Sequence, residues 1–436
     1  MRSKKEIFGW AMFDFANQAY TLLITTVVFG DLFTRIIVGD APDFKKGNLL
    51  WSLALAISYM MVVLSAPVCG AIMDYSASRK RFLFGSYILN VFSTAALYFV
   101  APGMLKLGVI LIIVSNFSYS IGEAFIASFL PGLGKPEELG KISGFGWAMG
   151  YVGGMFSAVL VLALLGDVSY ENFDRIRWVG PWAGFFFLVA AVPTFLWVRE
   201  RGTPRPLPEG RSYLAIGADR VVHTVKSLKR YKDMGITLLS MFFAMCGIYV
   251  VITYAFIYGA QVVGWEESVR TLMFITVQVT AAIGAIVFGF IQNRIGAKQT
   301  YQITLLMWIG SILLIFLTPW LGGFISSLLN LESPIHPQYI FLTVGSLAGL
   351  SLGSCQSTTR ALVGLFAPQH RTAEFFGFWG MSLKFAGVCG VLFIGVLQVV
   401  LGLRLAILFC ALLFAAALVL SRPLDVKRGM TAAAED

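Results

Sequence analysis

The sequence predicts an all-α polytopic membrane protein with twelve transmembrane helices, divided into two pseudo-symmetric bundles of six. Three observations predict this class: the composition, the number of long apolar windows, and a motif that recurs half a chain apart. Of 436 residues, 58% are hydrophobic and 13% charged, and the mean hydropathy is +0.79. Soluble domains carry about 25% charged residues, so the composition excludes an ordinary soluble fold.

Twelve windows of about 20 apolar residues are long enough to cross a bilayer. They cover residues 8–31, 49–72, 82–101, 107–129, 143–165, 179–198, 235–258, 268–291, 299–320, 339–360, 374–399 and 403–421. The first window follows MRSKKE as in a signal peptide, but it is too long, contains Asp14 and lacks an A-x-A cleavage site. We therefore interpret it as the first transmembrane helix.

The basic residues predict the orientation in the membrane. With a cytoplasmic N-terminus, the inside segments hold 24 Lys and Arg residues against 8 outside, which is the bias of cytoplasmic loops. The net charge of +10 is thereby explained without nucleic acid, since no basic domain with interleaved aromatics is present. We expect both termini to be cytoplasmic and the protein to lie in a bacterial inner membrane as a monomer surrounded by lipid.

One long connection separates the two sets of six windows. The predicted division is an N-terminal bundle, a cytoplasmic linker, a C-terminal bundle and a cytoplasmic tail, over residues 1–198, 199–234, 235–421 and 422–436. Within the linker an apolar face at helical spacing is formed by Leu214, Ala218, Val221, Val225 and Leu228. This pattern fits an amphipathic helix on the inner leaflet, and it fits a plain charged connection as well.

A short motif repeats at a constant distance along the chain. GAIMDYSASRK follows the second window and GFIQNRIGAK follows the eighth, with matching residues 219 positions apart. Glycine permits close helix approach, and Asp74 is expected to meet the dipole or basic groups of a neighbouring helix end. The predicted gating residues are Gly70, Asp74, Arg79, Arg81, Gly289, Asn293 and Lys298.

Polar side chains form one stripe on each of three otherwise apolar windows. In the first window Asp14, Gln18 and Thr21 recur at helical spacing beside Asn17, and similar stripes occupy the fourth and tenth windows. Such faces avoid lipid and should converge on a wet cavity. The predicted cavity or substrate residues are Asp14, Asn17, Gln18, Asn116, Tyr119, Glu123, Tyr249, Gln356, Arg360 and Lys384.

Depth in the membrane distinguishes the charged members of this set. Asp14 and Glu123 lie at about the same level, ~9 Å from the inner end at 1.5 Å per residue, and Lys384 lies ~15 Å deep. A lysine so placed needs an acidic partner, a substrate carboxylate or the loss of its proton. Glu123 and Asp14 are the candidate proton carriers. The alternatives are a structural ion pair for Glu123 and Lys384, and hydrogen bonds that fix the first helix for Asp14 and Asn17.

The repeated loop resembles the signature of the major facilitator superfamily, with Ala77 where that family usually has Gly. A narrower resemblance rests on FDFANQAY at residues 13–20, the run FIASFLPGLGKPEELGKISGFGWAMGYVGG, and QSTTRALVGLFAP followed by AEFFGFWGMSLKFAG. These segments are similar to the vacuolar amino-acid effluxers linked to autophagy and their bacterial relatives. The resemblance implies two bundles that rock about a central cavity lined by helices 1, 4, 7 and 10. Cys246 stands where that family usually carries Asp.

Together these observations predict a secondary transporter and no enzyme. No GxxxxGK[ST] phosphate loop occurs, and the five cysteines lie within apolar windows without a CxxC pair, so neither a cofactor nor a metal is expected. We expect an exporter of a small polar or zwitterionic solute, such as an amino acid, that works by proton-coupled alternating access. The alternatives are an exporter of amphipathic drugs or lipids, and a membrane sensor or scaffold that does not transport.

Overall fold

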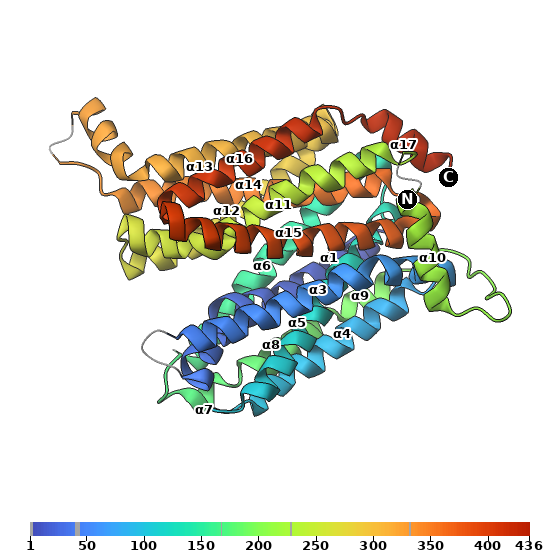
Figure 1. Cartoon of the computed structure of the whole chain (residues 1–436), viewed down its shortest axis with the longest axis horizontal. Helices are drawn as coiled ribbons and strands as arrows, with labels where there is room; N and C mark the ends of the chain where they lie inside the picture. The colour runs from blue at the N-terminus through green and yellow to red at the C-terminus, as the bar shows by residue number, and fades with distance from the viewer. Residues whose placement is uncertain (1–2, 40–43, 167, 227–228, 331–332) are drawn as a thin grey trace. The chain divides into compact units, whose positions relative to one another are not determined.

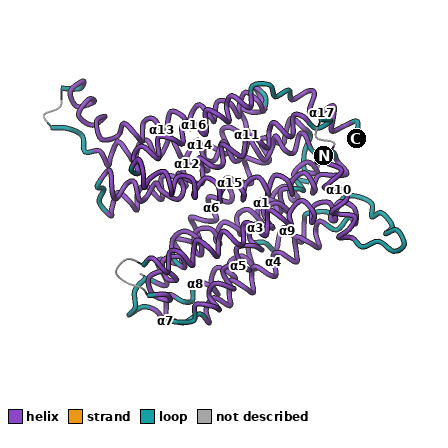
Figure 2. Tube along the Cα trace, in the orientation of Figure 1, coloured by secondary structure: helices purple, strands orange, loops and turns teal. Residues whose placement is uncertain are grey.

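The computed structural model describes residues 3–39, 44–166, 168–226, 229–330 and 333–436. Within these residues the regular structure is entirely helical (Figure 2). Twelve of the described segments are long and apolar enough to cross a membrane, from Lys4–Val38 to Leu403–Ser421. The predicted twelve spans and the all-α class are confirmed, and most spans extend a few residues beyond the apolar windows.

The first six spans follow one another from the N-terminus. They contain α1 (Lys4–Tyr20), η1 (Thr21–Val27), α2 (Phe29–Asp31), η2 (Leu32–Val38), α3 (Lys45–Ser76), α4 (Arg79–Ala96), η3 (Leu97–Phe99), α5 (Leu105–Ala127), η4 (Leu130–Gly132), η5 (Pro136–Glu138), α6 (Leu139–Leu165), α7 (Phe173–Ile176), α8 (Val179–Ala190) and α9 (Val192–Trp197). The first span is unusual because α1 continues as two π-helical stretches, η1 and η2. Such wide turns are rare and often mark functional positions.

The remaining spans follow a linker helix, α10 (Tyr213–Lys226). They contain α11 (Lys232–Tyr258), η6 (Gly259–Val263), α12 (Glu267–Ile295), α13 (Ala297–Leu328), α14 (Pro337–Phe366), η7 (Gln369–Arg371), α15 (Thr372–Leu401) and α16 (Leu403–Ser421), before a terminal helix α17 (Val426–Ala434). The seventh span, like the first, ends in a π-helical stretch, which is η6.

The described residues group into two compact units. Unit 1 comprises Met1–Pro136, Met149–Ser227 and Ala367–Lys384, and unit 2 comprises Glu137–Ala148, Leu228–Phe366 and Phe385–Asp436. Helices α6 and α15 therefore contribute residues to both units. These groups of packed residues do not test the linear division into bundles, linker and tail, which stays a prediction.

In unit 1 the spans pack through aromatic and small side chains. Helix α5 packs against α3 and α4, and α1 packs against α8 and α9 (Figure 1). Trp10 is fully buried and its indole Nε1–H donates to the carbonyl oxygen of Ile126 at 2.7 Å. The Phe13 and Phe187 rings meet edge to face with centroids 5.3 Å apart. This core fixes α1 against α5, which carries the polar stripe of the fourth span.

In unit 2 the helix pairs that pack most extensively are α12 with α14, α13 with α14, and α11 with α16. Trp308 and Phe414 stack with ring centroids 5.1 Å apart and an interplanar angle of 3°. Ser240 donates its hydroxyl to the carbonyl oxygen of Ala417 at 2.7 Å and lies 3.0 Å from the Tyr301 hydroxyl. Helices α11, α13 and α16 are thereby joined by both stacking and hydrogen bonds.

The linker helix α10 buries a face that the apolar pattern did not predict. Ile216, Gly217 and Thr224 are buried, and α10 packs against α3. A Cβ at Gly217 would lie 2.8 Å from Cγ1 of Ile72, so this contact requires glycine. The predicted apolar face is instead exposed at Leu214 and Val225. Leu228 of that face lies outside the described residues, and seating on the inner leaflet stays a prediction.

Candidate functional site

A buried ion pair joins the fourth and eleventh spans in unit 1. The Lys384 Nζ atom of α15 donates to Oε2 of Glu123 in α5 at 2.7 Å. The Lys384 side chain is 6% exposed and the Glu123 side chain 22%. Lys384 lies twelve residues into α15, or about 18 Å along the helix axis at 1.5 Å per residue. The lysine therefore has the acidic partner that its depth required, and part of the carboxylate stays accessible.

Two tyrosine rings flank the same ammonium group. The Lys384 Nζ atom lies 5.4 Å from the ring centroids of both Tyr59 in α3 and Tyr119 in α5. The Tyr119 hydroxyl donates to Glu123 Oε1 at 3.0 Å. A cation near the face of an aromatic ring gains about 0.5–2 kcal/mol, more when it is desolvated. One carboxylate and two ring faces thus form a site whose chemistry suits a primary ammonium group.

A chain of hydroxyl groups connects this site to the first span. The Thr21 hydroxyl donates to the Tyr119 hydroxyl oxygen at 2.7 Å, and the Tyr119 hydroxyl in turn donates to Glu123. Tyr20 stacks on Tyr119 with ring centroids 4.9 Å apart, and its hydroxyl lies 2.8 Å from the Ser115 hydroxyl. Thr21 is the first residue of the π-helical stretch η1. The wide turn therefore begins where the first span meets the buried pair.

The energetics of this pair limit what it can do. Removing one partner of a buried ion pair leaves an uncompensated charge and costs about 3–5 kcal/mol. Glu123 can accept a proton or bind a different cation, and either event releases the Lys384 ammonium group. The released ammonium group can then bind an anion. The arrangement is suited to exchanging one charged partner for another.

The predicted residues of the first span lie on a close helix contact of unit 1. A Cβ at Gly150 of α6 would lie 3.0 Å from Cγ of Gln18 and 3.4 Å from the Asp14 carbonyl oxygen. Asp14 and Gln18 are half-buried, while Asn17 is buried and its Oδ1 atom has no hydrogen-bond partner among the described residues. The glycines of α6 allow this approach, and the buried amide oxygen is an acceptor for a donor from water or cargo.

Asn116 and Tyr119 continue the polar stripe of the fourth span. The Asn116 side chain is buried, and its Nδ2 donates to the Ser58 hydroxyl of α3 at 2.5 Å. Ser58 directly precedes Tyr59. The same stripe therefore positions α3, whose next residue contributes a ring face to the buried pair, so Asn116 acts as a positioning residue for Tyr59.

The other predicted site residues belong to unit 2. Arg360 of α14 is buried, and its guanidinium donates to the hydroxyl and the carbonyl oxygen of Ser143 at 3.1 and 2.8 Å. It also lies 5.2 Å from the Trp147 ring. Gln356 and Tyr249 are half-buried, and a Cβ at Gly387 would lie 3.4 Å from the Tyr249 ring. Convergence of these residues with Asp14 and Glu123 on one cavity stays a prediction.

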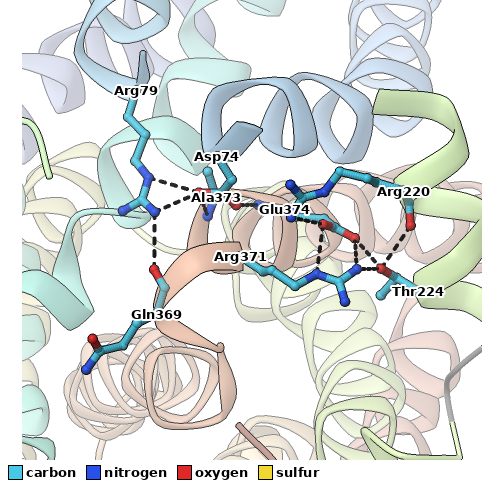
Figure 3. A network of polar contacts seen from close by, with 8 residues as sticks. All are labelled: Asp74, Arg79, Arg220, Thr224, Gln369, Arg371, Ala373 and Glu374. Atoms are coloured by element: carbon cyan, nitrogen blue, oxygen red, sulfur yellow. Dashed lines mark hydrogen bonds and ion pairs between the residues drawn. The ribbon is translucent and has the colours of Figure 1, made fainter. Parts of the chain in front are cut away.

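The first copy of the repeated loop caps a helix of the second half of the chain. Asp74 accepts two hydrogen bonds from Arg79, at 3.0 and 2.7 Å, and two from the backbone N–H groups of Ala373 and Glu374, at 3.1 and 2.8 Å (Figure 3). Its side chain is 0% exposed. A carboxylate at a helix N-terminus is favoured by unsatisfied N–H groups and by the helix dipole. The predicted contact with a helix end is thus present, at the start of α15.

Residues that the sequence analysis did not select as site residues extend this contact. Together with Asp74 and Arg79 they form what we call the α15 network: Asp74, Arg79, Arg220, Thr224, Arg371 and Glu374. Glu374 is fully buried and accepts from Arg371 at 2.8 and 3.2 Å. Arg220 of α10 lies 3.4 Å from Glu374, and the Thr224 hydroxyl donates to the same carboxylate. Figure 3 shows these side chains, which belong to α3, α4, α10, η7 and α15. The sequence signal was an acidic residue in the first turn of α15.

The second copy of the loop repeats the close approach but has Asn293 in place of the acid. A Cβ at Gly289 would lie 2.8 Å from the Gly140 carbonyl oxygen, at the start of α6. Asn293 Oδ1 is buried and has no hydrogen-bond partner among the described residues. Lys298 donates to the carbonyl oxygen of Arg422 at 2.7 Å. In the first copy Arg79 contacts the buried carboxylate, whereas Arg81 is exposed.

The helical membrane-spanning fold and the capped repeat loop define a transporter of the major facilitator type. Solved structures share this fold: the human organic anion transporter MFSD10 aligns with 96% of this chain and 99% of its own, with TM-score 0.72 and 13% identity. The Escherichia coli fucose:proton symporter FucP aligns with 97% of this chain and 98% of its own, with TM-score 0.71 and 14% identity. At such identities the likeness concerns the fold alone.

The sequence relationship is more specific. The model of the family described as "Vacuole effluxer Atg22 like" matches residues 50–434, and the chain belongs to this family. The MFS-type transporter YxiO of Bacillus subtilis is 24% identical over 91% of this chain and 89% of its own length. Autophagy-related protein 22-1 of Penicillium rubens is 23% identical over 87% of this chain and 75% of its own length. The predicted family resemblance is confirmed, and the protein is a membrane transporter, not an enzyme.

Proposed function

We propose that the protein exports a small zwitterionic solute, such as an amino acid, by proton-coupled alternating access. The observation that carries the proposal is the ion pair between Glu123 and Lys384, which lies deep in two spans and is bordered by tyrosine rings. Charged groups inside a membrane protein are expensive and are typically functional. Membership of a family described as vacuole effluxers supports the direction of transport.

The chemistry of the pair supports proton coupling. The titratable groups that face Glu123 are Lys384 of α15, Tyr119 of α5 and Tyr59 of α3. A proton that binds the Glu123 carboxylate breaks its ion pair with Lys384 and prevents it from binding a cationic cargo group. Proton and cargo therefore occupy Glu123 in turn. Such alternation is what exchange of an entering proton for a leaving solute requires.

Counterflow in proteoliposomes tests the function. Proteoliposomes that contain the purified protein and are loaded with unlabelled amino acids should accumulate radiolabelled amino acids. Exchange restricted to amphipathic cations or lipids would favour the drug or lipid exporter. If neither amino acids nor amphipathic compounds are exchanged, the remaining interpretation is a membrane sensor or scaffold. Thermal stabilisation by a panel of solutes gives an independent readout, because a ligand stabilises the native state by RT ln(1 + [L]/Kd).

Glu123→Gln tests the coupling. We expect uphill transport to lose its pH dependence while downhill exchange is partly retained. Glu137→Gln, at an exposed acid of the η5 segment, is the matched control and should behave as wild type. If Asp14→Asn removes the pH dependence and Glu123→Gln does not, the proton carrier is Asp14. Loss of folded Glu123→Gln protein from the membrane would favour a purely structural pair.

We also propose that both termini and residues 199–234 face the cytoplasm of a bacterial cell, on the basis of the Lys and Arg bias. Ser212→Cys places a thiol at an exposed position of the linker. A membrane-impermeant thiol reagent should label it only in permeabilised cells, and unmodified protein controls for the five native cysteines. Labelling in intact cells would reverse the orientation.

A further inference from the structure

The Lys384 ammonium group occupies a site with the features of an ammonium-binding pocket. Glu123 supplies a carboxylate oxygen at 2.7 Å, and Tyr59 and Tyr119 supply ring faces at 5.4 Å. Carboxylates and aromatic faces are the groups that recognise organic cations. The Glu123 side chain is also the more accessible member of the pair, at 22% against 6% for Lys384. A cargo group can therefore approach the carboxylate before it reaches the lysine.

We propose that the α-ammonium group of the cargo replaces Lys384 at Glu123, Tyr59 and Tyr119, and that the displaced Lys384 binds the cargo carboxylate. This inference rests on the proposed function and names how the zwitterion binds. No covalent bond changes, and no charge is left uncompensated: one internal ion pair becomes two ion pairs, each between the protein and one end of the cargo. The empty protein carries in Lys384 a tethered substitute for the cargo ammonium group.

Two features of the site favour this exchange over a fixed structural pair. Lysine has a flexible four-carbon stem and a compact ammonium group, so it can leave Glu123 without movement of the α15 backbone. The Tyr119 hydroxyl already donates to the second oxygen of Glu123, which holds the carboxylate in position when the lysine leaves. Thr21 orients that hydroxyl through its own hydrogen bond at 2.7 Å, so it is a positioning residue for the ammonium site.

The first arm of the test uses cargo chemistry. A neutral L-amino acid, its N-acetyl derivative and its amide should be compared as competitors of radiolabelled amino-acid counterflow in the same proteoliposomes. Loss of the ammonium charge should weaken competition about 10- to 100-fold, as expected for a buried charge-assisted hydrogen bond. Equal competition by the N-acetyl derivative would overturn the ammonium site while the transport function survives. If none of the amino acids tested is exchanged, both the ammonium site and the proposed transport function are overturned.

The second arm is chemical rescue and needs no transport. Lys384→Ala leaves space for a primary ammonium group beside Glu123, so propylammonium should raise the thermal midpoint of the purified variant saturably, and 1-propanol should not. Lys106→Ala, at an exposed lysine, and the double variant Glu123→Gln with Lys384→Ala should both fail to respond to propylammonium. If Lys384→Ala does not fold, Lys384→Ser, which leaves almost the same space, replaces it. A response equal to that of propanol, or one that persists without Glu123, would overturn the inference.

Discussion

Gly70 in unit 1 and Gly289 in unit 2 stand 219 residues apart, and each brings its helix against the first turn of another. Beside Gly70, Asp74 holds Arg79 and the first N–H groups of α15. The matching residue beside Gly289 is Asn293, whose buried Oδ1 atom has no hydrogen-bond partner among the described residues. The close approach is therefore common to both copies, while the ionic network is confined to unit 1.

A second comparison gives the opposite result. Glu6, at the start of the first span, accepts hydrogen bonds from Arg201 at 2.7 Å and from the Arg199 backbone at 3.2 Å. In unit 2, Asp233 accepts from both the Nε and Nη2 atoms of Arg428 at 2.7 Å. The acids are 227 residues apart, and so are Arg201 and Arg428. An ion pair thus connects the first helix of each half to the segment after its last helix, and it is present in both halves.

The difference separates two tasks that one motif can combine. Close approach requires only glycine, so it persists in both loops. A buried carboxylate paired with an arginine stabilises the contact further, as long as the two partners stay together. In this chain such a pair is found at the contact with the start of α15. We infer that the two loops are mechanically unequal, with the α3–α15 contact the stronger one. The following predictions test this inequality.

Asp74→Asn should have the largest effect, because it makes the first loop chemically equivalent to the second. It leaves Arg79 without its buried partner and should lower the free energy of unfolding by about 3 kcal/mol or more. Thermal unfolding of purified protein in detergent is the measurement. Asn293→Asp is the converse change and should give no gain, since Lys298 is engaged with Arg422. Wild-type stability of Asp74→Asn would show that the network is not stabilising.

Gly70→Ala should come next. Its Cβ would lie 2.1 Å from the Ala373 carbonyl oxygen, against 2.8 Å from the Gly140 carbonyl oxygen for Gly289→Ala. Overpacking of this kind destabilises by about 1–3 kcal/mol, and the loss at Gly70 should exceed that at Gly289. Gly85→Ala is the control in the same assay, because nothing lies within 4 Å of its Cβ. Equal losses at Gly70 and Gly85 would contradict the contact.

Glu6→Gln and Asp233→Asn should have smaller and similar effects. The arginine partners Arg201 and Arg428 are 36% and 48% exposed, so solvent screening should make each loss of stability smaller than that of Asp74→Asn. Hydrogen exchange should become faster in the segment that each acid holds, after the sixth span and at α17 respectively. A response in only one of the two segments would break the proposed correspondence.

The smallest effect concerns pH at α17. A hydrogen bond from the Arg428 backbone N–H lowers the pKa of Asp425, which caps this helix. Because the folded-state pKa is lowered, the contribution to stability is complete above the ordinary value of 3.8 and is lost as the pH falls through the lowered pKa. Hydrogen exchange in α17 should accelerate over that acidic range. Asp425→Asn should remove this pH dependence, and its persistence would assign the effect to another group.

The twelve spans could be predicted because length and hydropathy are local properties of the chain. The partner of Lys384 could not be predicted, because Glu123 lies 261 residues away in the sequence. Asp14 or a substrate carboxylate could equally have supplied the negative charge that a buried lysine needs. The estimated depth of each residue in the membrane reduced the number of candidate partners but did not identify the one that Lys384 contacts.

The α15 network was missed for a related reason. Glu374 and Arg371 are ordinary residues of a helix start, and Thr224 lies on the buried face of a linker helix whose visible pattern was a different, apolar face. The contacts of these three residues depend on which helix ends, distant in the sequence, lie together in the fold. Asp74 was recognisable because its role as a cap follows from its residue type and position at a helix end.

The long sequence separation of the Glu123–Lys384 pair has a consequence for biogenesis. Glu123 enters the bilayer with the fourth span, and Lys384 follows only after a further 261 residues, or roughly 10 to 50 s at the usual rates of synthesis. During this interval the carboxylate lacks its lysine, at an insertion cost of about 2.5–3.5 kcal/mol. A chain that terminates before the eleventh span never gains that partner, so closure of the pair distinguishes completed chains from truncated ones that quality control should remove.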